Sequence, residues 1–144
     1  MGFPDRIERT IELAHPPVKV WAALTTAEGL GTWFGNEADI ELRPGGKGWM
    51  RWNEGGHRAD MRVERVEKPH VFGFTWHIFG LPEEDPRRTY VEFTLEPVAA
   101  GTRLTVVEIG FAQLAEDAYK AAFESNTRGW QNELGELASY LDAA

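Results

Sequence analysis

The sequence predicts an α+β domain in which a curved antiparallel sheet of six to seven strands wraps a long C-terminal helix. Two observations predict this class. Between residues 6 and 109, apolar and polar residues alternate in several short segments, which is the period of half-buried strands. After residue 116, apolar residues recur every three or four positions, which is the period of a helix. Runs of strands beside segregated helices are typical of α+β domains.

The first strand is expected over Arg6–Leu13, and two short helices should follow it. Pro16 and Pro17 end the strand. Pro17 can also open a helix, because the first helical position needs no N–H donor. We expect the first helix over residues 18–25 and the second over residues 27–33, where two glycines weaken it.

The remaining strands alternate up to residue 106 and are separated by turn signals such as Pro44-Gly45-Gly46. One of them slips its pattern, because Val66 rather than Arg65 is apolar, and this predicts a bulge or a strand end. These strands are expected over residues 38–42, 47–52, 59–63 and 71–78, around 91–95, and around 104–106.

The long helix is expected over about residues 116–141, a length of roughly 39 Å. We expect Gly129 and Gly135 within it either to let the sheet approach closely or to leave space for a ligand. Its apolar stripe consists of Tyr119, Phe123, Asn126, Trp130, Leu134, Leu137 and Leu141.

Composition limits the classes of function. A length of 144 residues suits a single domain over residues 1–144. The absence of cysteine excludes disulfides and thiol catalysis. The net charge of -8 argues against nucleic-acid binding. No apolar run approaches the roughly 20 residues of a membrane span, so we expect a cytoplasmic protein without membrane contact. The sequence leaves open whether the chain forms a homodimer.

Glu108 is the leading candidate for chemistry. It shares one strand face with Leu104 and Val106, so it should point inward with them. A buried carboxylate is costly unless it is paired, and such a group can orient a ligand or act as an acid or base. The alternatives are that Glu108 pairs with an arginine, or that it meets water at the edge of the sheet.

No other motif predicts a reaction. The four histidines have no metal-ligand spacing, so neither a metal nor another cofactor is expected. His77 lies on the strand face opposite Phe72, Phe74 and Trp76 and is expected to be exposed. No Gly-x-Ser-x-Gly motif is present.

Several segments together resemble one known superfamily. They are residues 17–25 (PVKVWAALT), Trp33-Phe34, Pro44-Gly45-Gly46, residues 74–76 (FTW), 101–105 (GTRLT) and 108–111 (EIGF), and Gly129-Trp130. The chain is similar to the START-like, or SRPBCC, superfamily, and most of all to its branch of heat-shock-chaperone ATPase-activator homologues. The resemblance implies a helix-grip fold with a cavity between the sheet and the C-terminal helix. Members bind lipids, polyketides, hormones and other apolar molecules, and some catalyse cyclisation or dehydration.

Three hypotheses of function follow. The first is a non-enzymatic protein that binds a small apolar or aromatic ligand between sheet and helix. The second is an enzyme of the same fold that uses Glu108 for cyclisation or hydration, and the third is a chaperone-interacting module. A full aromatic core without a cavity is the structural rival of the first. The residues expected to line the ligand site are Trp33, Phe34, Trp52, Phe72, Phe74, Trp76, Phe93, Glu108, Phe111, Tyr119, Phe123, Asn126 and Trp130.

Overall fold

The computed structural model describes residues 5–53, 56, 58–78, 81–82 and 84–143. Among these residues, seven strands form one antiparallel sheet in the order β1-β7-β6-β5-β4-β3-β2. Strands β2 to β7 therefore form a meander, and β1 pairs with β7 at one edge of the sheet. Its strands are β1 Arg6–Leu13, β2 Glu37–Ile40, β3 Lys47–Arg51, β4 Arg58–Glu67, β5 Val71–His77, β6 Arg88–Val98 and β7 Gly101–Ile109.

The helices lie before β2 and after β7. They are α1 Pro17–Thr25, α2 Ala27–Gly29, the π-helical turn η1 Leu30–Phe34, the 3-10 turn η3 Phe111–Gln113 and the long helix α3 Glu116–Ala143. No helix in the described ranges is long and apolar enough to cross a membrane. The order of strand, short helices, six strands and long helix agrees with the sequence prediction.

The second short helix differs from its prediction. It was expected as one helix over residues 27–33, but α2 ends at Gly29 and a π-helical turn follows. The N–H of Gly35 bonds the carbonyl of Leu30 at 2.8 Å, which is the i to i+5 spacing of a π-helix. This wider turn places both Trp33 and Phe34 in the core.

The pattern slip in β4 is a bulge, and the strand does not end there. The pairing of β4 with β5 shifts register between Val63 and Arg65, and β4 then continues to Glu67. The extra residue restores the inward direction of the apolar side chains after the slip.

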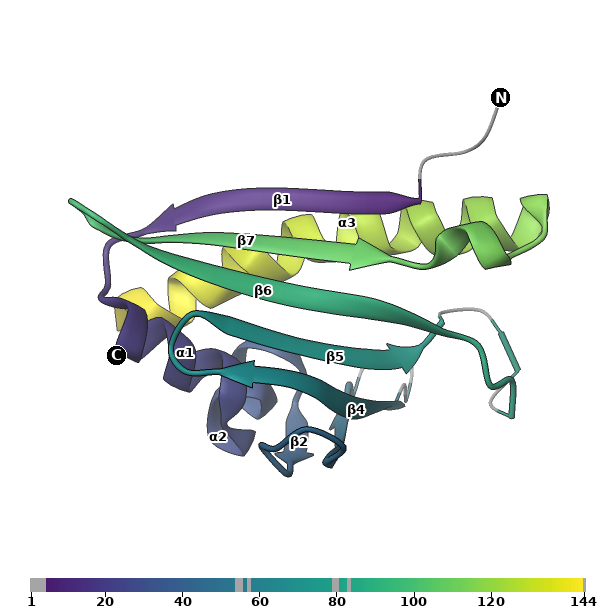
Figure 1. Ribbon diagram of the computed structural model, residues 1–144, viewed down its shortest axis with the longest axis horizontal. Helices are drawn as coiled ribbons and strands as arrows, with labels where there is room; N and C mark the ends of the chain where they lie inside the picture. The colour runs from purple at the N-terminus through teal and green to yellow at the C-terminus, as the bar shows by residue number, and fades with distance from the viewer. Residues whose placement is uncertain (1–4, 54–55, 57, 79–80, 83, 144) are drawn as a thin grey trace.

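The core lies between the sheet and α3, which runs along one face of the sheet (Figure 1). Alternate side chains of β6 and β7 are buried, as are Phe72, Gly73 and Phe74 of β5 and one stripe of α3. At the C-terminal end of α3, His15 Nε2 lies 2.7 Å from Asp142 Oδ1, and Lys19 Nζ donates to the carbonyl of Leu141 at 3.3 Å. These contacts fix the last turn of α3 against the start of α1. The sheet, the short helices and α3 together form the expected helix-grip arrangement.

The two glycines of α3 make no close approach to the sheet. Apart from its chain neighbours and the nearby backbone of α3 itself, a Cβ built on Gly129 or on Gly135 would meet no described atom within 4 Å. Of the two alternatives, the close approach of the sheet is therefore wrong, and space is left at both positions. Gly101 is the opposite case, because its φ is +146° and an added Cβ would collide with the carbonyl oxygen of Leu13 and lie 2.6 Å from the backbone nitrogen of His15.

The same substitution should therefore have opposite effects at Gly101 and Gly135. Gly101→Ala should lower the free energy of unfolding by about 2 kcal/mol or more, because it adds backbone strain and a clash. Gly135→Ala should raise it by about 0.5–1 kcal/mol through helix propensity. Urea unfolding monitored by circular dichroism measures both values. Equal effects at the two positions would contradict this account.

Candidate functional site

Glu108 is fully buried on β7, and its carboxylate accepts five hydrogen bonds. Trp76 Nε1 donates to Oε2 at 2.8 Å, and Thr89 Oγ1 donates to the same oxygen at 2.5 Å. Trp130 Nε1 donates to Oε1 at 2.8 Å. Asn126 Nδ2 lies 3.0 Å from both oxygens. The inward direction of Glu108 agrees with the strand alternation.

The register of the sheet and the period of α3 bring these donors together. Trp76 pairs with Thr89 across β5 and β6, and Val91 pairs with Glu108 across β6 and β7. Thr89 is therefore the diagonal neighbour of Glu108. Asn126 is four residues before Trp130, so both side chains leave the same face of α3. One carboxylate thus connects three strands and the helix.

Every donor to Glu108 is neutral. No salt bridge in the described part of the chain includes this residue. The alternatives of an arginine partner and of a sheet edge in water are therefore both wrong. A carboxylate offers about four lone-pair sites, so five hydrogen bonds leave little capacity for a further donor. This saturation does not favour Glu108 as a general base.

Aromatic rings pack directly around the carboxylate, and we call this group the aromatic cluster. Phe34 lies at its centre, with ring centroids 5.7 Å from Trp52, 5.7 Å from Trp76 and 5.4 Å from Trp130. Trp76 and Trp130 stack at 5.7 Å. These separations are those of rings in contact, so the rings themselves fill this part of the interior. The cluster consists of Trp33, Phe34, Trp52, Phe72, Phe74, Trp76, Phe93 and Trp130.

The other three predicted rings form a separate group where η3 leads into α3. Phe123 lies 5.4 Å from Phe111 and 5.3 Å from Tyr119, centroid to centroid. Phe111 and Tyr119 are buried, whereas Phe123 is half-buried.

Four of the predicted lining residues keep some contact with solvent: Trp52, Trp76, Phe123 and Asn126. All the others are buried. We call these four the accessible margin. Trp76 and Asn126 meet at the Glu108 carboxylate, and Trp52 contacts Phe34 beside Trp76. Of the predicted site residues, these four are therefore the most open to solvent.

Sequence reasoning missed two residues of this site. Thr89 lies two residues before Val91 and four before Phe93. The alternation of the strand could therefore have placed it on the inner face. Trp21 belongs to α1, and its ring lies 6.4 Å from that of Phe72. No local pattern indicates that second contact, because it depends on how α1 docks on the sheet.

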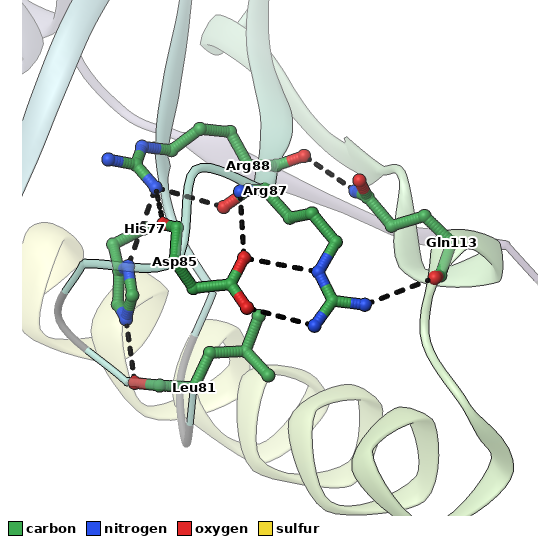
Figure 2. Close-up of polar contacts among 6 residues, drawn as sticks. All are labelled: His77, Leu81, Asp85, Arg87, Arg88 and Gln113. Carbon is green, nitrogen blue, oxygen red and sulfur yellow. Dashed lines mark hydrogen bonds and ion pairs between the residues drawn. The ribbon is translucent and has the colours of Figure 1, made fainter.

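A second polar cluster lies where β5 leads into β6 (Figure 2). Arg87 donates to both oxygens of Asp85, at 3.1 and 2.9 Å, and these hydrogen bonds lower the pKa of that carboxyl to about 2. Gln113 Nε2 donates to the carbonyl of Arg88 at 2.8 Å. Arg87 in turn donates to the carbonyl of Gln113 at 3.4 Å. The cluster therefore fastens the start of β6 to η3.

His77 belongs to this second cluster. It was expected to be exposed but is half-buried. Its Nε2 lies 2.9 Å from the carbonyl oxygen of Leu81, which can only accept, so Nε2 is the donor. Within the described residues, no group of three histidine, aspartate or glutamate side chains could hold a metal ion.

Glu133 is a half-buried acidic residue that sequence reasoning missed. Its Oε2 is buried and has no hydrogen-bond partner among the described residues. Burial, and then the negative charge of Glu136, raise the pKa of Glu133 to about 8. Glu133 lies three residues after Trp130 on α3, at the edge of the buried stripe.

A shallow, open groove of about 480 Å³ lies between η1 and α3. Trp33 is the one predicted site residue that lines it. The other lining residues are Thr32, Asn132, Gly135, Glu136, Ser139 and Tyr140.

Replacing Glu108 should strongly destabilise the fold. In Glu108→Gln, an amide NH₂ replaces an acceptor and faces donors, so the free energy of unfolding should fall by about 2 kcal/mol or more. Urea denaturation provides the measurement. Glu96→Gln, on the exposed side of β6, is the control and should change stability by less than about 0.5 kcal/mol. Similar values for the two variants would argue against the hydrogen-bond network.

Glu133 should make stability fall as pH rises. Between the ordinary pKa of 4.5 and the raised pKa of about 8, the folded carboxyl holds a proton that the unfolded one has lost. The stabilisation that Glu133 gives the wild-type protein is therefore fully present below pH 4.5, and it is lost as the pH rises toward about 8. Glu133→Gln should flatten that decline in urea unfolding measured at a series of pH values. Glu124→Gln, on the exposed side of α3, should leave the decline unchanged; parallel curves for all three proteins would refute the assignment.

Known proteins share the fold of this chain. A family model described as Activator of Hsp90 ATPase homolog 1-like protein matches residues 14–142. No curated protein is similar enough to count as a match. The crystal structure of MLL2253 from Mesorhizobium loti aligns with a TM-score of 0.82 and 27% identity, over 96% of this chain and 98% of that one.

Two other structures extend the comparison. The solution structure of BH1534 from Bacillus halodurans aligns with a TM-score of 0.76 and 26% identity, over 98% of this chain and 99% of that one. DynU16, a protein in the dynemicin biosynthetic locus, aligns with a TM-score of 0.79 and 24% identity, over 96% of this chain but 48% of that one, and shares the fold. The chain belongs to the Activator of Hsp90 ATPase homolog 1-like family, within the START-like, or SRPBCC, superfamily.

Proposed function

We propose that this protein binds a small apolar or aromatic ligand at the accessible margin of the aromatic cluster, without a metal or another cofactor. The observation that carries the proposal is the margin itself. Trp52, Trp76, Phe123 and Asn126 stay partly open to solvent, while the other rings of the aromatic cluster are buried. Covering partly exposed rings with an apolar molecule removes more apolar surface from water, which favours binding by about 25 cal/mol per Å².

The margin is held in place before any ligand arrives. Trp76 is oriented by its hydrogen bond to Glu108, and Trp52 donates to the carbonyl of Phe34 at 2.7 Å. Ring faces that are already fixed lose little conformational entropy on binding. Apolar walls with a few fixed polar groups are typical of small-molecule sites. Members of the superfamily that this chain resembles bind apolar molecules, and this resemblance supports the same function.

The other two hypotheses have weaker support. An enzyme would need a free acid or base, and the oxygens of Glu108 are saturated by hydrogen bonds. Glu133, with its raised pKa, is the one observation that favours catalysis, but no contact links it to Glu108 among the described residues. The chaperone-interacting module rests on the family alone.

A neutral apolar dye tests the proposed function. N-phenyl-1-naphthylamine should become fluorescent when the wild-type protein is added and should saturate. Trp52→Leu removes one ring of the margin and should weaken the dissociation constant about three- to tenfold, which is the contribution expected of one aromatic contact.

Trp49→Leu is the matched control. Trp49 lies on the other face of β3, where Arg58 covers its ring at 4.8 Å, so its loss should leave the affinity unchanged. The proposal fails if the wild-type protein gives no saturable signal, or if both variants weaken binding equally.

A further inference from the structure

The side-chain amide of Asn126 has a fixed orientation. Amide nitrogen and oxygen are usually distinguished only by their hydrogen-bond partners. Here Nδ2 lies 3.0 Å from both carboxylate oxygens of Glu108. A carboxylate can only accept, so the NH₂ group must face Glu108 and Oδ1 must point away from it. The buried network therefore determines the direction of an acceptor outside it.

Asn126 Oδ1 is an acceptor without a protein partner. No hydrogen bond in the described part of the chain reaches it. Asn126 is half-buried, and the one buried side-chain oxygen that lacks a partner among the described residues is Glu133 Oε2. Solvent therefore reaches Asn126 Oδ1. The atom is an oriented acceptor at the accessible margin.

Aromatic side chains lie beside Asn126. The indole of Trp76 shares Glu108 Oε2 with the Asn126 amide, so the two side chains are neighbours. Phe123 lies one turn earlier on the same side of α3. A flat molecule that lies against both rings and Asn126 would also cover Oδ1 and exclude water from it. If the molecule carries no donor there, the acceptor is left unpaired, which weakens binding.

The charge of the site selects against anions. All four side chains that contact Glu108 are neutral, and no described salt bridge offsets its charge. The whole chain carries a net charge of -8. A carboxylate on the ligand would meet an acceptor at Asn126 and a negative charge behind it, both of which are unfavourable.

We propose that the ligand class of this site is a neutral, flat, apolar molecule with one hydroxyl or N–H donor, and that Asn126 Oδ1 accepts that hydrogen bond. This inference rests on the proposed function, because it names the chemistry of the ligand for the same margin. Asn126 is then the residue that determines specificity, while the rings provide the affinity that all flat apolar molecules share.

Three naphthalene derivatives of similar size test the donor requirement by isothermal titration calorimetry at neutral pH. 2-Naphthol offers a donor, 2-methylnaphthalene has the same shape without one, and 2-naphthoate is an anion. The wild-type protein should bind 2-naphthol at least about threefold more tightly than 2-methylnaphthalene, although the methyl compound is the more hydrophobic. Binding of 2-naphthoate should be the weakest.

A variant assigns the preference to its residue. Asn126→Leu should abolish the preference for 2-naphthol over 2-methylnaphthalene and still bind the latter. Asn132→Leu, at an exposed position of the same helix, should keep it. If Asn126→Leu does not fold, the order of the three compounds on the wild-type protein decides the proposal.

The possible failures are distinguishable. If the wild-type protein binds 2-naphthol and 2-methylnaphthalene equally, or if Asn126→Leu keeps the preference, the donor requirement is overturned while the apolar site stands. Tight binding of 2-naphthoate would also overturn it. If none of the three compounds binds, the proposed function fails, and this inference fails with it.

Discussion

The structure depends on one requirement, which is that the buried carboxylate of Glu108 must have hydrogen-bond partners. Burial without partners would cost several kcal/mol. The partners come from β5, β6 and α3, so each element must be in register with β7 for the network to close. A one-residue slip of β7 would turn Glu108 to the outer face, and a rotation of α3 would remove Asn126 and Trp130 together. The carboxylate therefore acts as a shared reference point for sheet and helix.

The choice of donors explains how a charge fits in an aromatic core. An arginine partner would bring a second charge that also has to be desolvated. Trp76 and Trp130 instead donate from ring nitrogens while their faces stack on each other at 5.7 Å. The same two side chains satisfy the polar group and fill the space around it. Among the described residues, the carboxylate therefore sits in the core without a cationic partner.

The sequence was sufficient for those features that depend on local period. Alternation along β7 predicted that Glu108 points inward, and the misplaced Val66 predicted the bulge in β4. The three–four spacing predicted α3 and put Asn126 and Trp130 on its inner face. The donors to Glu108 were not predictable as a set, because their meeting depends on the crossing of helix and sheet. The π-helical turn η1 was missed for a related reason, since nothing in its local pattern distinguishes it from an α-helix.

The aromatic residues illustrate why a count of rings does not define a site. Most of the predicted rings are buried against one another, so they contribute stability and shape. Under the proposed function, the residues that a ligand would meet are the few whose side chains stay partly open. Their burial becomes known only when all the elements are placed. Asn126 belongs to both groups, because its nitrogen completes the buried network and its oxygen is left outside. Under the proposed function, the interaction that orders the core also orients the group that selects the ligand. Selectivity and stability are then coupled through a single amide, and a change at Glu108 would alter ligand preference by freeing that amide to rotate, without any contact between Glu108 and the ligand.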